Sequence, residues 1–157
     1  MKSIVWAAWV AALLVACAAP NPADLKPGMP LDEIRAQMGQ ERASYPLPGG
    51  GKRLEFRGRG PNTFMVDVDA SGRTVQVVQV LNVDNFRNII AGMTTEQVLM
   101  TLGRPDNVMP GGRQGGQIWS YNFQNTQCQW FQVAIGADGR TSGPGAQSML
   151  PACMHAP

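Results

Sequence analysis

Histidine is almost absent from this chain, and its scarcity excludes several kinds of active site. His155 is the single histidine among 157 residues. A catalytic triad built on histidine and a metal site with several histidine ligands are therefore excluded. The chain also lacks a Gly-x-Ser-x-Gly segment, and its glycine-rich stretches, residues 48–52 and 110–116, do not have the spacing of a phosphate-binding loop. We expect no enzymatic activity, no cofactor, no metal ion and no small-molecule substrate.

Neither sign of charge is in excess. Lys and Arg together number 13 and Asp and Glu together number 11, so the formal net charge is +2. This balance gives no electrostatic reason to expect nucleic acid or an anionic membrane surface as a partner. Asp67 and Asp69 resemble the start of an EF-hand calcium loop, but the twelfth position is Val78, which cannot supply the bidentate carboxylate. We therefore expect a plain hairpin turn there.

No apolar run near the start of the chain is long enough to cross a bilayer. The run from Ile4 to Ala16 has thirteen residues, whereas a spanning helix needs about 20. Together with Lys2, it predicts a cleaved export signal over residues 1–16. An ordinary small-residue cleavage site would also fit the end of this segment. Residues 17–24, which contain Pro20 and Pro22, predict a short extended tether.

The end of the export segment resembles the lipobox of bacterial lipoproteins. Leu14-Val15-Ala16-Cys17 matches the family pattern, in which the cysteine is acylated and becomes the new N-terminus. The resemblance implies lipidation of Cys17 with fatty acyl chains such as palmitate. Ala18 rather than Asp follows the cysteine, which implies sorting to the outer membrane. More than one acyl chain gives stable anchoring, so we expect attachment to the periplasmic side of that membrane.

Cysteine is scarce beyond the lipobox. Cys128 and Cys153 form an even pair in a chain that we expect to be exported, and the simplest prediction is a disulfide between them. Such a bond would fasten residues 144–157, a tail rich in glycine and proline, to the preceding sheet. Two free, buried cysteines are the alternative.

Residues 90–105 predict a complete helix with both ends marked. Thr94 is a good N-cap, and Gln97 completes a capping box three residues later. Gly103 supplies the C-terminal cap, and Pro105 prevents the helix from continuing. Val98, Leu99 and Leu102 form a narrow apolar stripe that can pack on another element.

A diverged copy of this stretch lies 64 residues earlier, at residues 28–39. Gly28, Met29 and Gly39 match Gly92, Met93 and Gly103, whereas Pro30 replaces the Thr94 cap. Similarity continues in the loops at 48–50 and 110–112 and in the turns at 70–74 and 137–141. A fixed order of helix, loop, strand and turn predicts an internal duplication, with unit 1 at residues 25–82 and unit 2 at residues 83–143.

The fold class that follows is α+β, with two tandem helix-plus-antiparallel-sheet units. Each unit of about 60 residues is too small to be stable alone, so we expect them to pack into one domain with the helices on one face of the sheet. Residues 142–157 are expected to be irregular. The expected helices are 30–38, 84–89 and 94–102, and the expected strands are 44–47, 53–57, 63–69, 73–81, 107–109, 117–124 and 129–136.

Aromatic side chains gather on one predicted strand face. Trp119, Tyr121 and Phe123 alternate along one strand, and Trp130 begins the next. Such residues could form a protein-binding patch or the core layer beneath the helices. Tyr45, Phe56 and Arg57 of unit 1 carry the same ambiguity, so all seven are candidate protein-binding residues.

Several of these features resemble the BamE (SmpA/OmlA) family of small outer-membrane lipoproteins. The resemblance rests on residues 92–105, on Trp119-x-Tyr121-x-Phe123, on the Asp138-Gly139 turn and on the lipobox. Unit 1 is a diverged copy that lacks the Thr cap, the Trp and the Pro after the helix. A tandem pair of such units also resembles the β-lactamase inhibitor protein.

These resemblances imply two functions. The first is a non-enzymatic periplasmic lipoprotein that scaffolds envelope proteins, with barrel-assembly components as partners and outer-membrane assembly or envelope integrity as its task. The second is a protein inhibitor of a periplasmic or secreted hydrolase such as a β-lactamase. The matching motifs are caps, turns and core aromatics, so they imply fold more strongly than function.

Overall fold

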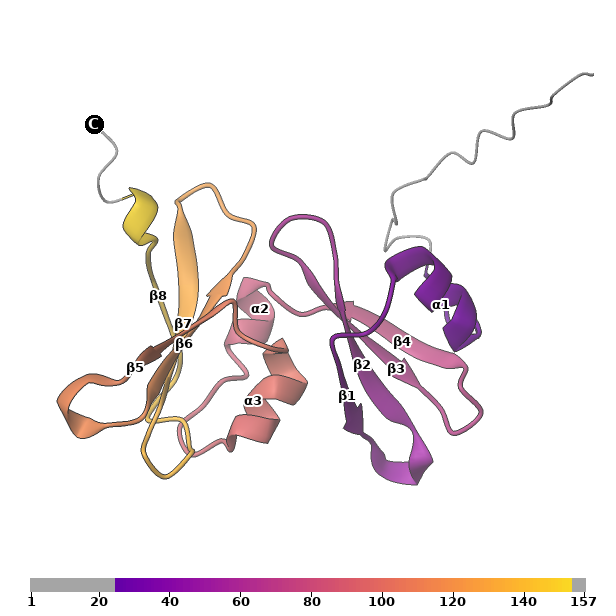
Figure 1. Cartoon of the computed structure of the whole chain (residues 1–157), viewed down its shortest axis with the longest axis horizontal. Helices are drawn as coiled ribbons and strands as arrows, with labels where there is room; N and C mark the ends of the chain where they lie inside the picture. Colours follow the sequence, from indigo (N-terminus) through magenta and orange to yellow (C-terminus); the bar gives the residue numbers. More distant parts are fainter. Residues whose placement is uncertain (1–24, 154–157) are drawn as a thin grey trace, which may run out of the picture.

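A computed structural model describes residues 25–153 and shows an α+β protein with two four-stranded antiparallel sheets. Figure 1 shows the sheets one after the other, with the helix pair of the second half between them. The predicted export segment, Cys17 and His155 lie outside the described residues. None of the helices within 25–153 has the length and apolar character needed to cross a membrane.

The first half consists of one helix followed by a sheet whose strands are in chain order. The strands are joined in the order β1-β2-β3-β4, and each neighbouring pair is antiparallel. The elements are α1 (Leu31–Met38), β1 (Ala43–Pro46), the 3-10 turn η2 (Pro48–Gly50), β2 (Lys52–Arg57), β3 (Thr63–Val68) and β4 (Thr74–Gln79).

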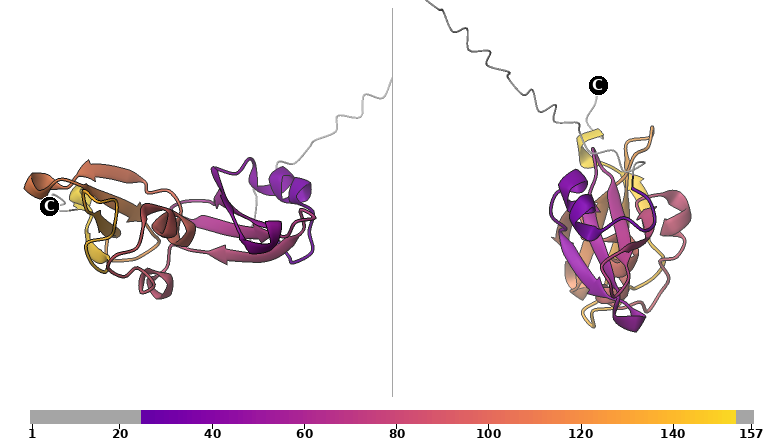
Figure 2. Two further views of the ribbon diagram at one scale, coloured as in Figure 1. Left: turned by 90° about the horizontal axis from the view of Figure 1, so that it is seen from below. Right: turned by 90° about the vertical axis from the view of Figure 1, so that its right-hand side faces the viewer.

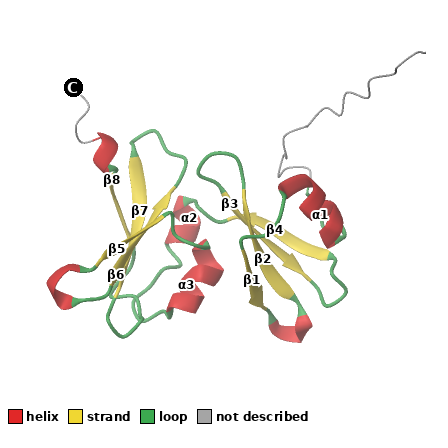
Figure 3. Cartoon of the chain, in the orientation of Figure 1, coloured by secondary structure: helices red, strands yellow, loops and turns green. Residues whose placement is uncertain are grey.

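The second half has the same order after an additional short helix. Its sheet runs β5-β6-β7-β8, again antiparallel throughout (Figure 3). The elements are α2 (Val83–Phe86), α3 (Thr95–Leu102), β5 (Asn107–Pro110), η3 (Gly112–Gln114), β6 (Gln117–Asn122), β7 (Gln129–Ile135), β8 (Ala146–Met149) and η4 (Pro151–Cys153).

The capping box of α3 is confirmed. The backbone N–H of Gln97 donates to the Thr94 hydroxyl over 3.2 Å, and the Thr94 N–H donates to the Gln97 side-chain oxygen over 2.8 Å. α1 begins after Pro30 without a side-chain cap. The helix expected at 84–89 is shorter and begins earlier, at Val83, because the side chain of Asn82 caps it by accepting the N–H of Asn85.

Equivalent hydrogen bonds join the segments before α1 and α3 to a turn beside their own sheets. In the first half, Pro30 before α1 pairs with Arg73, which follows the β3–β4 turn. In the second half, Thr94 before α3 pairs with Arg140, which follows the turn after β7. In the first half these bonds are Gly28 N–H to Thr74 O (2.6 Å), Thr74 N–H to Met29 O (2.9 Å) and Arg73 to Gly28 O (3.0 Å). In the second half they are Gly92 N–H to Thr141 O (2.9 Å), Thr141 N–H to Met93 O (2.9 Å) and Arg140 to Gly92 O (2.8 Å).

The first sheet is buried on both faces, which differs from the expected arrangement with helices on one face. Leu54, Phe56 and Val66 pack with Ile34 of α1 in one apolar cluster. Residues of alternate parity on the same sheet, such as Met65, belong instead to the cluster built around α2, α3 and the second sheet. Figure 1 shows the first sheet lying between α1 and α3.

Two strand assignments differ from the sequence predictions. Residues 142–157 were expected to be irregular, but Ala146–Met149 form β8, an edge strand paired with β7. The strand expected at 73–81 is shorter, Thr74–Gln79 (β4), and lies at the sheet edge, where it pairs only with β3.

Candidate functional site

The aromatic residues predicted as a binding patch lie in the core. Trp119, Tyr121 and Phe123 are 8%, 0% and 7% exposed and pack beneath α2 and α3. Phe86 of α2 stacks on Phe131 and meets Phe123 edge to face. This stripe fills the space between helices and sheet, so it offers no contact surface to a partner.

The remaining candidates are also engaged within the protein. Tyr45 and Phe56 are buried on opposite faces of the first sheet. Arg57 is half-buried and forms an ion pair with Asp106 over 2.7 Å. Trp130 is half-buried, and its indole N–H donates to the hydroxyl of Ser148 on β8 over 2.7 Å. The seven residues therefore do not gather into one exposed patch.

A fully buried carboxylate joins the two halves. Glu55 on β2 is 0% exposed and accepts hydrogen bonds from the Tyr45 hydroxyl (3.1 Å) and the Arg104 backbone N–H (3.0 Å). Arg42 lies 3.4 Å from its second oxygen. Nearby, Arg53 donates to the carbonyl of Met100 in α3 over 3.1 Å. These contacts fix the orientation of α3 on the first sheet.

The hairpin that contains Asp67 and Asp69 forms a turn and a salt bridge. Arg53 binds both carboxylate oxygens of Asp67 at 2.7 Å. Asp69 accepts from the Ser71 N–H and hydroxyl and from the Arg73 N–H, and these bonds, led by the Ser71 hydroxyl, lower its pKa. Across residues 25–153 no group of three or more His, Cys, Asp or Glu is placed to hold a metal ion.

Two adjoining pockets lie beside β8, and together we call them the β8 groove. The first pocket, of about 400 Å³, is mainly apolar, and Phe86, Ile89, Phe131 and Gly145 contribute to its lining. A side chain at Gly145 would collide with the Phe131 ring, so only glycine at this position leaves room for the ring. The second pocket, of about 520 Å³, shares Val83 and Gln147 with the first.

The second pocket is lined by carboxamides and carries no charged residue. Some of these amides are fixed: Gln79 donates to Asn62 (3.2 Å), and Asn82 donates to the carbonyl of Gln79 (2.7 Å). Gln127 and Gln147 also line the pocket and are exposed. A neutral, amide-lined surface can both donate and accept hydrogen bonds, as peptide groups do.

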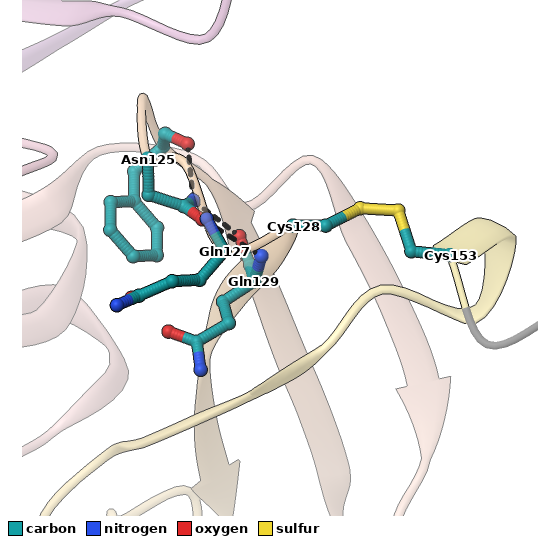
Figure 4. The surroundings of a disulfide bond; sticks show 6 residues. Asn125, Gln127, Cys128, Gln129 and Cys153 are labelled. Atoms are coloured by element: carbon teal, nitrogen blue, oxygen red, sulfur yellow. Dashed lines mark hydrogen bonds between the residues drawn. A yellow bond between two sulfur atoms is a disulfide. The ribbon is translucent and has the colours of Figure 1, made fainter. Parts of the chain in front are cut away.

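The loop that enters β7 is held in one conformation. Asn125 donates to the carbonyls of Phe123 (2.9 Å) and Gln129 (2.8 Å), and its oxygen accepts from the backbone N–H groups of Gln127 (3.1 Å) and Gln129 (2.9 Å) (Figure 4). Cys128 has a positive φ of 54°, a conformation that non-glycine residues adopt only where their surroundings enforce it.

The predicted disulfide between Cys128 and Cys153 is confirmed. The two Cα atoms lie 6.4 Å apart, and Figure 4 shows the bond joining the start of β7 to η4. Because η4 directly follows β8, the bond holds that edge strand against the sheet. Within the tail, the sequence prediction was right about the bond and wrong about the absence of a strand.

Sequence reasoning missed the β8 groove because it missed β8. The sequence similarity between the two halves contained a signal that could have found it, since the turn at 137–141 matches the turn at 70–74, after which β4 follows. Gly143, Pro144 and Gly145 separate β8 from its turn, so the matching strand was not expected there.

Comparisons with known proteins leave the family open. No protein-family model matches this chain, and no curated protein matches it. Among solved structures, a cysteine-rich secretory protein from Staphylococcus aureus is similar at 13% identity over 87% of this chain, with a TM-score of 0.29. This chain covers 50% of the length of that protein.

Proposed function

We propose that this protein is a non-enzymatic, protein-binding lipoprotein anchored to the periplasmic side of the outer membrane through Cys17. It scaffolds envelope proteins and assists the assembly of outer-membrane barrel proteins. The observation that carries this proposal is the lipobox, Leu14 to Cys17, followed after a short tether by a folded domain that begins near Leu25. A lipid anchor concentrates a binding domain at the membrane surface where its partners are assembled.

We also propose that the two halves arose by duplication of one helix-and-sheet unit. The matched hydrogen bonds from Gly28 and Gly92 to the turns of their own sheets support this proposal. So does the equal position of Gly39 and Gly103, which end the two helices with φ values of 82° and 81°.

The anchor is tested with the full chain and a Cys17→Ser variant. The wild-type chain should incorporate labelled palmitate and fractionate with outer membranes, and the variant should do neither. A wild-type chain that remains unlabelled would overturn the lipoprotein proposal, and Cys128→Ser serves as the control because Cys128 lies far from the lipobox in sequence.

Partner binding is tested by affinity purification from mildly solubilised membranes after brief crosslinking. Barrel-assembly components should be recovered with the wild-type chain and depleted with Cys17→Ser. Recovery of none of them would contradict the scaffold role. Inhibition of an envelope hydrolase such as a β-lactamase by the purified chain would favour the inhibitor function instead.

A further inference from the structure

We propose that the outer edge of β8 and the β8 groove form a docking site for an extended segment of a partner polypeptide, which adds to the second sheet as a further strand. This inference deepens the proposed protein-binding function and rests on it. The segment it fits is uncharged and β-prone, with a bulky apolar side chain that enters the pocket near Phe86 and Phe131.

The backbone of β8 shows which residues face outward. The N–H of Leu150 donates to the carbonyl of Cys128 over 2.9 Å, and the two residues are opposite each other in the register that pairs Met149 with Gln129. Hydrogen-bonded and non-bonded pairs alternate along an antiparallel ladder. Ser148 therefore bonds to β7, whereas the N–H and C=O groups of Gln147 and Met149 point away from the sheet.

These outward groups have no neighbouring strand within the described residues, because the sheet ends at β8. A row of alternating donors and acceptors is complementary to the backbone of another extended chain. Of the three other edge strands, β1 and β5 each end in a proline, Pro46 and Pro110, whereas β4 contains none. β8 contains no proline, so its edge lacks this protection.

The groove beside this edge adds selectivity. Gln147 lies opposite Phe131 in the register, so its side chain stands on the sheet face that carries the groove and lines both pockets. The amide-lined pocket can bond to peptide groups of the incoming segment, and the apolar pocket takes one of its side chains. Arg87 at the rim is paired with Asp84 over 2.9 Å, which offsets its charge and favours a neutral ligand.

The edge is already ordered before a partner arrives. The Cys128–Cys153 disulfide joins the residue before β7 to the turn after β8 at one end of the strand pair, and the Asn125 hydrogen bonds fix the loop at the same end. Ordering a strand on binding costs conformational entropy, so a strand held in advance binds more tightly. Exposed Met149, at 51% exposure, adds apolar area next to the outward backbone groups.

A synthetic peptide tests the site on the full chain in mild detergent. The probe is a capped peptide of about eight residues in which Thr alternates with Val and Phe, the pattern of a strand with one apolar face. Its binding is followed by fluorescence anisotropy, and its position by amide hydrogen exchange. Exchange at Gln147 and Met149 should slow at least tenfold on binding, while exchange at Ser148, already bonded to β7, should change little.

Matched proline substitutions identify the edge. Gln147→Pro removes an outward N–H without removing a ladder bond, and affinity should fall at least tenfold. Val108→Pro is the control, because Val108 is 47% exposed on β5, at the opposite edge of the same sheet, and affinity should be unchanged. A probe methylated at alternate backbone nitrogens should lose binding to the wild-type chain, which tests the proposal without any change to the protein.

Several outcomes would overturn the docking site. They are no binding of the peptide, equal binding to Gln147→Pro, equal binding of the methylated probe, or self-association of the chain through β8 in place of peptide binding. The affinity purification separates this inference from the proposed function. If Gln147→Pro recovers the same envelope proteins as the wild type, the docking site is wrong and the scaffold role stands; if the wild type recovers none, the scaffold role fails.

Discussion

The backbone N–H of Arg104, directly after α3, donates to the buried carboxylate of Glu55 on β2 over 3.0 Å. This bond joins the two halves at the point where α3 ends. Tyr121 of the second sheet donates to the carbonyl of Gly103 in the same place, over 3.2 Å. A single polar cluster therefore fixes how the end of α3 sits between the two sheets.

Removal of the Glu55 carboxylate should destabilise the whole domain. We expect Glu55→Ala to lower the free energy of unfolding by about 3 kcal/mol, because Arg42 and the Arg104 N–H then lose their buried partner. Glu55→Gln should cost less, since its amide oxygen can still accept from Arg104. Urea unfolding followed by tryptophan fluorescence, to which buried Trp119 contributes, measures both. Glu33→Ala, at an exposed position on α1, should change the stability by less than about 0.5 kcal/mol.

Gly39 and Gly103 form a matched pair for testing the contact between the halves. Both end a helix at nearly the same positive φ, in a region that side chains avoid. A Cβ at Gly39 would meet nothing within 4 Å, whereas one at Gly103 would lie 3.0 Å from the Glu55 side chain.

The two alanine variants should therefore differ. Gly39→Ala should cost about 1 to 3 kcal/mol from backbone strain alone. Gly103→Ala should cost more, because it also displaces Glu55. Chemical unfolding measures the free energy of unfolding of both variants. Equal losses would show that the side chains around Glu55 rearrange without loss of stability, and that the cluster does not control the docking of the halves.

Local features were predictable from the sequence. Thr94 with Gln97, Gly103, and the turn at Asp138-Gly139 are all determined by neighbours within a few residues, and the structure places each as expected. The pairing of Cys128 with Cys153 followed because few cysteines are available. The α+β class followed from the alternation of these short patterns.

Long-range packing was not predictable in the same way. Glu55 appears in the sequence as an ordinary strand residue, and nothing near it indicates that Arg104 and Tyr45 will surround it. The aromatic residues that alternate along β6 fit either a partner-binding surface or a core layer. The contacts of Phe86 in α2 with Phe123 and Phe131 show that this face is covered by a helix. β8 was missed because Gly143, Pro144 and Gly145 separate it from the turn at 137–141 and give the segment the composition of an irregular tail.

Alkaline titration should show no tyrosine ionisation in the native protein near the usual pKa of about 10. The chain has two tyrosines. Burial, followed by the charge of Glu55, raises the pKa of Tyr45, and burial raises the pKa of Tyr121 well above its ordinary value. The native state therefore holds these protons more tightly than the unfolded chain does, so this contribution to stability is complete below pH 10 and is lost as the pH rises further.

The measurement is the near-ultraviolet absorbance of tyrosinate as the pH is raised. Both tyrosines should ionise together with loss of the far-ultraviolet circular dichroism, whereas in urea they should ionise near pH 10. Ionisation of either residue near pH 10 while the fold is intact would contradict the burial of the Glu55 cluster.

Reduction of the disulfide should weaken the tail more than the rest of the fold. The bond closes a sequence separation of 25 residues, which on the chain-entropy argument contributes about 3 kcal/mol. The double variant Cys128→Ser/Cys153→Ser should lose about that much in urea unfolding. In amide exchange, Ser148 should become exposed much sooner than Val133 in the centre of β7, because β8 is an outer strand and Val133 is fully buried. Uniform loss of protection across the second sheet would mean that β8 and β7 unfold as one unit, and that the disulfide does not act on the edge strand alone.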